Sequence, residues 1–191
     1  MATLAGSVVR LEPLEARHTP GLFTCLGKDD EAWRWMIVQT PQSLADISAI
    51  VEGYIADRIA GSRMPYAVIE HSSDRVIGTT SLMDISKKDR GCEIGSTIYA
   101  REFWRTKVNT ESKFLLLRQA FEVENSIRVS FKTDHLNIRS QTAIQRIGAT
   151  YEGRFRSHRI RADGSLRDSM YYSIIASEWP AVKSKLEALL K

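Results

Sequence analysis

The segment from Gly91 to Ala149 constrains the fold most, because strand and helix patterns alternate in it without a break. A strand pattern over Cys92 to Tyr99 precedes a helical pattern over Thr110 to Glu124 and a second strand pattern over Ile127 to Thr133. This order predicts two parallel strands joined by a crossover helix. It also places a helix N-terminus just after a strand, where free backbone N–H groups and the helix dipole favour a bound phosphate.

The flanking segments add further strands and helices, so we predict an α/β protein with one mixed sheet. An edge strand is expected near Val9 to Pro13, because apolar and polar residues alternate there. Further helices are expected over Glu15–Leu26, from Ser43 onward, over Asn137–Ile147 and over Glu178–Leu190. Two hairpins are also expected: one pairs Tyr66–Glu70 with Arg75–Ile85, and the other pairs Thr150–Ile160 with Asp168–Ile175. No internal repeat or linker divides the chain, and we expect a single domain over residues 1–191.

Composition excludes several classes of protein. The hydrophobic fraction of 43% and the charged fraction of 26% are ordinary for a globular domain. The two cysteines, Cys25 and Cys92, are far apart and the four histidines are scattered, so we expect no disulfide scaffold and no metal site. The absence of a long apolar run predicts a soluble, cytoplasmic protein without a membrane segment. A net charge of +4 favours an anionic ligand such as a nucleotide over a dedicated nucleic-acid surface.

The residues around the predicted phosphate seat resemble a known family. Trp104 and the six residues after it lie between the strand and the helix; those six are Arg105, Thr106, Lys107, Val108, Asn109 and Thr110. With the later Asn137-Ile138-Arg139-Ser140 run, this order resembles the GNAT superfamily of N-acetyltransferases. The Val-Asn-Thr-Glu run resembles its RimJ/RimL-like branch, whose members acetylate N-terminal amines of ribosomal proteins. The resemblance implies the GNAT fold, a curved central sheet with helices on both faces that binds acetyl-CoA where two parallel strands part.

The resemblance also implies which residues bind acetyl-CoA. The Arg105–Thr110 loop would hold the phosphates, Asn137 the pantetheine arm, and the backbone N–H groups of Ile94 and Gly95 the acetyl oxygen. The family usually has a Gln/Arg-x-x-Gly-x-Gly/Ala pattern here, whereas this chain has Trp104 at the first position and Lys107 at the usual glycine. Lys107 could pair with a phosphate, or it could crowd the loop if its backbone requires a positive φ. We expect Asn109 to cap the helix.

Two residues are candidates for proton transfer. By the resemblance, Ser140 approaches the cofactor sulfur and could protonate the leaving thiolate. The alternative is a helix capped by Asn137 with a solvent-facing Ser140. Glu93 is the candidate general base, and strand alternation places it on one face with Gly95 and Thr97. A structural carboxylate paired with a lysine or arginine is the alternative for Glu93.

Two further features concern the acceptor substrate. The resemblance places Trp33 and Trp35 beside the acceptor cleft, although core packing is the alternative for at least one of them. Alternation in the basic strand Arg154–Arg161 puts Arg154, Arg156 and His158 on one face. Such a strand could attract an acidic peptide or RNA, but it is more often a solvated face or a dimer contact. We assign no role to His158.

The sequence therefore predicts an N-acetyltransferase that moves an acetyl group from acetyl-CoA to a primary amine by direct attack in a ternary complex. The acceptor is a protein N-terminus or a small-molecule amine, and a homodimer is compatible with the sequence. Trp104 and Lys107 in the phosphate loop leave open a catalytically inactive acyl-CoA-binding or regulatory module. A basic RNA- or ribosome-associated protein is the third alternative, and it lacks a recognised RNA-binding motif.

Overall fold

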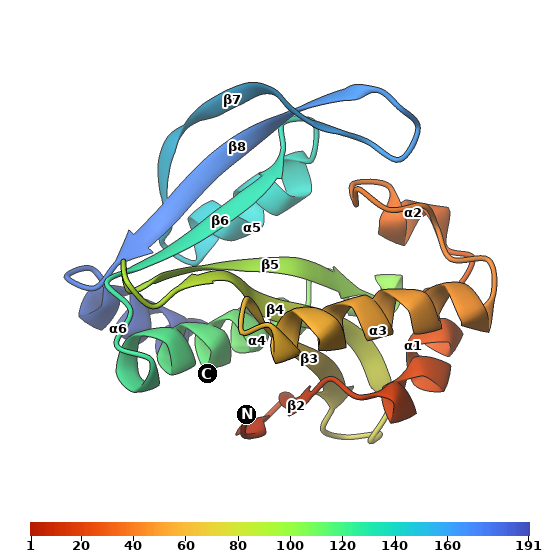
Figure 1. Ribbon diagram of the computed structural model, residues 1–191. Coiled ribbons are helices and arrows are strands. Elements are labelled where there is room, and N and C mark those ends of the chain that lie inside the picture. The colour runs from red at the N-terminus through yellow and green to blue at the C-terminus, as the bar shows by residue number, and fades with distance from the viewer.

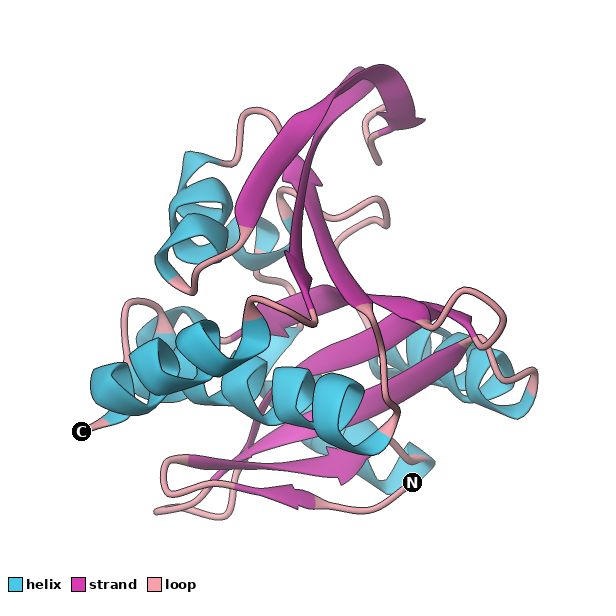
Figure 2. Ribbon diagram, turned by 90° about the vertical axis from the view of Figure 1, so that its left-hand side faces the viewer, coloured by secondary structure: helices cyan, strands magenta, loops and turns pink.

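A computed structural model describes residues 1–191 and contains one eight-stranded sheet with helices on both faces (Figures 1 and 2). The strands are β1 (Leu4–Ala5), β2 (Val9–Pro13), β3 (Arg63–Glu70), β4 (Val76–Ser86), β5 (Gly91–Tyr99), β6 (Arg128–Asp134), β7 (Thr150–Ile160) and β8 (Leu166–Ile175). Their order in the sheet is β1-β2-β3-β4-β5-β6-β8-β7. All neighbours are antiparallel except β5 and β6, which form the predicted parallel pair.

The helices divide between the two faces of the sheet. They are α1 (Thr19–Leu26), α2 (Asp30–Trp33), α3 (Leu44–Ile59), α4 (Lys107–Arg118), α5 (Ile138–Arg146) and α6 (Trp179–Leu190). Buried residues of α1, α2 and α3 pack in one apolar cluster, and those of α4, α5 and α6 pack in the other. Val68 and Ile69, neighbours in β3, belong to different clusters because successive strand residues point to opposite faces. We call these the α3 face and the α4 face.

The first edge of the sheet differs from the prediction. The strand β2 is not the edge, because the two-residue strand β1 pairs with it through Leu4 opposite Leu11. Glu111 of α4 fixes this region: its buried carboxylate accepts hydrogen bonds from the backbone N–H groups of Val8 and Val9, both at 2.7 Å. A Cβ at Gly6 would lie 2.3 Å from the Glu111 carboxyl carbon, so only glycine fits there. The N-terminal strand is therefore tied to the helix that follows β5.

Among the bulges of the sheet, one in β5 and one in β7 lie near the predicted site residues, each at a serine with a left-handed backbone. In β5, Gly95 pairs with Ser81 while Ile98 pairs with Thr79, so β5 carries one extra residue, and Ser96 has a φ of 47°. In β7 the register slips between residues 155 and 159, where Ser157 has a φ of 48°. The one extra residue of β5 reverses which of the following side chains point to which face. In β7 the irregular stretch holds two extra residues, because Phe155 pairs with Ser169 and Arg159 with Arg167. None of the helices is both long and apolar enough to cross a membrane.

Candidate active site

The two parallel strands part close to their start. β5 and β6 pair only at Gly91 with Arg128, Cys92 with Val129 and Glu93 with Ser130, although β5 continues to Tyr99 and β6 to Asp134. Figure 1 shows the two ribbons diverging beyond this point. After Glu93 the backbone of β5 pairs with β4 alone, so the edge that faces β6 offers unpaired N–H and C=O groups. An extended ligand arm can hydrogen-bond to such an edge in place of a strand.

The N-terminus of α4 lies beyond the end of β5, and its cap differs from the prediction. Thr106 is the N-cap, because its hydroxyl accepts a hydrogen bond from the backbone N–H of Val108 at 3.3 Å. Asn109, expected to cap the helix, lies inside its first turn. Arg105 has the positive φ, 63°, whereas Lys107 begins the helix with ordinary backbone geometry. Lys107 therefore does not strain the loop, and its Nζ donates to the carbonyl of Leu190 at 2.8 Å.

Residues of α5 that the sequence did not single out reach the start of α4. The Arg139 guanidinium lies over the Trp104 ring, 3.3 Å from its centroid. Arg146 donates a hydrogen bond to the Thr110 hydroxyl at 2.8 Å. Arg139 and Arg146 are seven residues apart, a spacing that puts both on one helix face and could have identified them. Burial, and then the charge of nearby Arg105, lower the pKa of Arg139 against the opposing charge of Glu31. Several cations thus surround this helix N-terminus, as a phosphate site requires.

Glu93 lies where the strands part, on the α3 face. It is 4% exposed, and its Oε2 lies 2.9 Å from the Nζ of Lys132. Burial raises the pKa of the Glu93 carboxyl, although the Lys132 charge opposes the shift. A Cβ at Gly95 would lie 2.8 Å from the Glu93 Oε1, so the glycine makes room for the carboxylate. The structure thus contains the predicted ion pair, and it also gives Glu93 the raised pKa of a candidate base.

Thr97 does not share a face with Glu93 and Gly95, contrary to the alternation argument. Its hydroxyl accepts a hydrogen bond from Lys113 of α4 at 2.6 Å and lies 2.7 Å from the hydroxyl of Thr80. The bulge at Ser96 reverses the alternation and turns Thr97 toward the α4 face.

Asn137 and Ser140 lie at the N-terminus of α5. The side-chain oxygen of Asn137 accepts a hydrogen bond from the backbone N–H of Ser140 at 3.0 Å. Asn137 is therefore the helix cap, as one reading of the sequence held, and only its amide N–H₂ can donate to a ligand. Ser140 is half-buried within this first turn. The helix begins just after β6, so both residues lie on the β6 side of the opening.

The hairpin of β7 and β8 contributes an aromatic cluster that the sequence did not predict. Tyr171 stacks on Phe155 at 4.2 Å between ring centroids, and His158 lies edge-on to Tyr171 at 5.7 Å. Tyr171 pairs across the sheet with Lys132, on the face of Glu93. Burial and the neighbouring cations, Arg159 first, lower the pKa of His158.

The predicted common face of Arg154, Arg156 and His158 is wrong. Arg154 Nε donates to Asp168 at 2.7 Å, whereas the His158 ring lies 3.0 Å from the hydroxyl of Ser169, the next residue along β8. Neighbouring residues of a strand point to opposite faces, so Arg154 and His158 do too. The bulge at Ser157 separates them.

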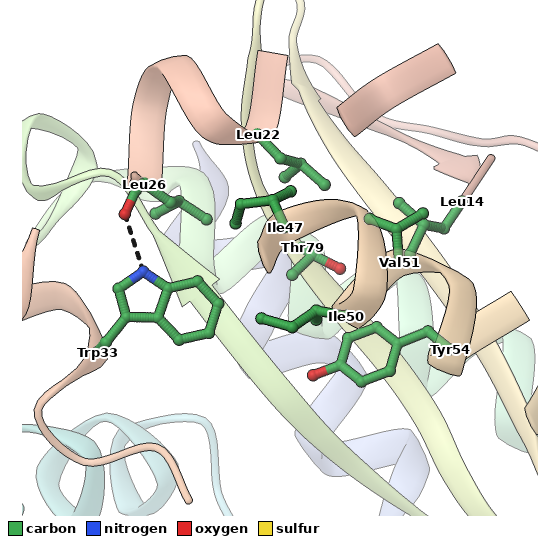
Figure 3. A pocket seen from close by; sticks show the side chains of 9 residues that line it. All are labelled: Leu14, Leu22, Leu26, Trp33, Ile47, Ile50, Val51, Tyr54 and Thr79. Atoms are coloured by element: carbon green, nitrogen blue, oxygen red, sulfur yellow. Dashed lines mark hydrogen bonds between the residues drawn. The ribbon is translucent and has the colours of Figure 1, made fainter. Parts of the chain in front are cut away.

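The two tryptophans have different environments. Trp33 is 3% exposed and packs with α1 and α3, and its Nε1 donates to the carbonyl of Leu26 at 2.8 Å (Figure 3). The cavity drawn in Figure 3 has a volume of about 10 Å³, too small for a substrate. Trp33 also lines a second cavity of about 160 Å³ between the segment after α2 and the β7–β8 turn. Trp35 is half-buried, with the Arg34 guanidinium 4.9 Å from its ring centroid.

Comparisons with known proteins agree with this geometry. A family model described as an acetyltransferase (GNAT) domain matches residues 9–150. A GCN5-related N-acetyltransferase from Brucella melitensis is 30% identical, with a TM-score of 0.92 and coverage of 100% of this chain and 86% of that one. A protein from T. thermophilus described as an acetyltransferase is 35% identical, with a TM-score of 0.90 and coverage of 100% and 98%.

A more distant structure has the same fold with a ligand bound. Mycobacterium smegmatis RimJ, solved in complex with CoA-disulfide, is 19% identical, with a TM-score of 0.83 and coverage of 98% of this chain and 91% of that one. No curated protein matches this sequence.

Proposed function

The chain belongs to the GNAT acetyltransferase family, and we propose that it transfers the acetyl group of acetyl-CoA to a primary amine. The observation that carries this proposal is the parting of β5 and β6 directly beside the capped N-terminus of α4. One ligand that combines an amide-bearing arm with phosphates would fit both features at once. The acceptor amine is a protein N-terminus, as in the RimJ/RimL-like branch, or a small molecule.

In this proposal the phosphates lie against Arg105 to Thr110, with Arg139 and Arg146 closing the far side. The backbone groups of Ile94 and Gly95 bind the acetyl end, and the Asn137 amide donates to the pantetheine arm. Acetyl-CoA supplies the activated carbonyl, and the protein holds it still and excludes water around it. Lys107 does not obstruct this arrangement, since its side chain turns toward the end of α6.

The proton balance involves two residues. The acceptor nitrogen forms a bond to the acetyl carbon, the carbon–sulfur bond breaks, and the proton of the amine passes to Glu93 directly or through water. Ser140 donates a hydrogen bond to the departing thiolate. Lys132 holds the Glu93 carboxylate at 2.9 Å and keeps it ionised enough to accept the proton. An N-terminal amine with a pKa near 8 is already about a tenth neutral at pH 7, so a modest base suffices for it.

Calorimetric titration with acetyl-CoA, with desulfo-CoA and ATP for comparison, tests the cofactor site. An assay of acetyl transfer to a panel of primary amines, monitored by the release of the free CoA thiol, tests the reaction. We expect binding that depends on the pantetheine arm, followed by turnover on at least one amine. Binding without turnover on any amine would favour an inactive acyl-CoA-binding module. Steeply salt-dependent RNA affinity without acetyl-CoA binding would favour the RNA-associated alternative.

A further inference from the structure

Arg167 of β8 is a buried cation with unused hydrogen-bonding capacity. It is 9% exposed, and its Nε is buried without a hydrogen-bond partner. One terminal nitrogen donates to the carbonyl of Trp35, at a long 3.4 Å. A guanidinium has five N–H donors, and a buried one is costly unless most of them are satisfied. The Nε–H of Arg167 is therefore a buried cationic donor that is available to an anionic group.

The nearest carboxylate is already occupied. Asp134 is 1% exposed and accepts two hydrogen bonds from Arg161, at 2.7 Å and 3.0 Å. The Nε of Arg167 lies 3.8 Å from the same carboxylate, too far for a hydrogen bond. Burial lowers the pKa of Arg167, and the charges of Arg161 and Arg159 lower it further against the opposing charges of Asp134 and Glu93. Because Arg161 takes the hydrogen bonds of Asp134, that carboxylate does not satisfy the Nε of Arg167.

Arg167 lies on the same face of the sheet as Glu93, the candidate base. Strand alternation in β8 places it with Ser169 and Tyr171, and Tyr171 pairs across the sheet with Lys132, the partner of Glu93. Glu93 is close enough for its charge to act on the pKa of Arg167. A group bound by Arg167 would therefore lie on the same face as the candidate base.

The cavity of about 160 Å³ shares Arg161 with the surroundings of Arg167, although Arg167 itself does not line it. Arg161, which holds Asp134 beside Arg167, also lines the cavity; the full lining is Trp33, Arg34, Val38, Gln39, Thr40, Arg161, Ala162 and Asp163. The volume far exceeds the roughly 10–15 Å³ that one water needs, and it suits a small molecule. The Gln39 side chain donates a hydrogen bond to the carbonyl of Ala162, so the segment after α2 touches the β7–β8 turn.

We propose that Arg167 forms an anion subsite, and that the acceptor is a small amine that also carries a carboxylate, such as an α-amino acid. The inference rests on the proposed acetyl transfer. The acceptor carboxylate accepts hydrogen bonds from the free N–H groups of Arg167 while its amine faces Glu93. A hydrogen bond to a buried charged group typically changes affinity on the order of 10- to 100-fold.

The first test measures binding and requires no turnover. The protein, alone and saturated with CoA, is titrated with N-acetyl-L-alanine, N-acetyl-L-leucine and N-acetyl-L-glutamate, each beside its uncharged amide. We expect at least one carboxylate to bind about 10-fold or more tightly than its amide, and R167M to abolish the difference. R167K should keep part of this difference in affinity between carboxylate and amide. R156M, which removes an exposed arginine from the neighbouring strand, is the matched control and should keep the whole difference.

The second test measures acetylation of alanine, leucine and glutamate, their amides, and a trialanine peptide. We expect the free amino acids to have the highest kcat/KM and R167M to reverse that order while the protein stays folded. Equal binding of acids and amides, no binding of either, or a preference for trialanine would overturn the subsite. Turnover on the amides alone would then leave the proposed function standing. Carboxylate-selective binding with no acetylation of any amine would overturn the proposed function and leave the subsite.

Discussion

Lys113 offers a sharp test of how the structure tolerates a buried charge. It is 6% exposed on α4, its Nζ donates to Thr97 at 2.6 Å, and it has no carboxylate partner. Burial lowers its pKa from the ordinary 10.5 to about 7, against the distant charge of Glu93. At about 1.36 kcal/mol per pH unit, this shift of the Lys113 pKa corresponds to a cost of ~5 kcal/mol for burying the protonated amine. Structural relaxation and water entry reduce such penalties, so we expect K113M to raise the free energy of unfolding by about 1–4 kcal/mol.

The sign of the pH dependence provides an internal check. Between pH 7 and pH 10.5 the unfolded chain holds a proton on Lys113 that the folded chain has lost, so this residue makes stability rise with pH. K113M removes that contribution, and its advantage over the wild type should be largest near pH 7 and shrink toward pH 10. Thr97 retains the Thr80 hydroxyl as partner, so the substitution leaves no orphaned donor.

Equilibrium unfolding in guanidinium chloride at about pH 7, 8.5 and 10 measures the difference between variant and wild type. Taking the difference cancels the titration of tyrosines and cysteines common to both proteins. K185M, on the exposed side of α6, is the control and should change stability by less than about 0.5 kcal/mol. A loss of stability in K113M, or a difference that does not depend on pH, would refute the assignment of Lys113 as a buried amine without a carboxylate partner.

Three predictions concern the reaction itself. E93Q should lower kcat/KM by about 100-fold or more and flatten the rise of rate with pH, because the raised pKa of Glu93 delays its ionisation; a wild-type pH profile in E93Q would exclude it as the base. S140A should lower kcat with little change in acetyl-CoA affinity by calorimetry, and unchanged turnover would remove its role. R139M should weaken acetyl-CoA about 10-fold, since it removes a cation stacked on Trp104; an affinity equal to wild type would show that this arginine is only structural.

The sequence predicted the order of elements well because hydrophobic period and turn residues act locally. The β7 strand was predicted with its observed bounds, Thr150–Ile160, and α3 begins after the predicted cap at Ser43. The parallel pair followed from the same local reasoning, whereas the opening between its strands was implied by the family resemblance. Helix starts were less certain: α4 begins at Lys107 because the Thr106 hydroxyl, rather than Asn109, accepts the first free N–H.

What the sequence could not provide was the direction of side chains beyond a bulge. Ser96 and Ser157 adopt left-handed backbones although neither is the glycine or asparagine that would have marked the spot. Each lies where the strand register slips, and Thr97 and His158 consequently point to faces opposite to those predicted. The Arg167 environment was equally hidden, because it depends on Trp35 and Asp134, which are distant in the chain.

The hydrogen bonds between the Glu111 carboxylate and the backbone at the start of β2 restrict which substitutions this sequence can accept. The carboxylate occupies the space in which a Cβ at position 6 would have to lie, and the same carboxylate satisfies the backbone of Val8 and Val9. A side chain at Gly6 is thus compatible with the fold only after Glu111 has been shortened. Shortening Glu111 first would leave the backbone N–H groups of Ser7, Val8 and Val9 without their acceptor. Natural drift or a mutant library should therefore change these two positions together or leave both alone, even though more than a hundred residues separate them.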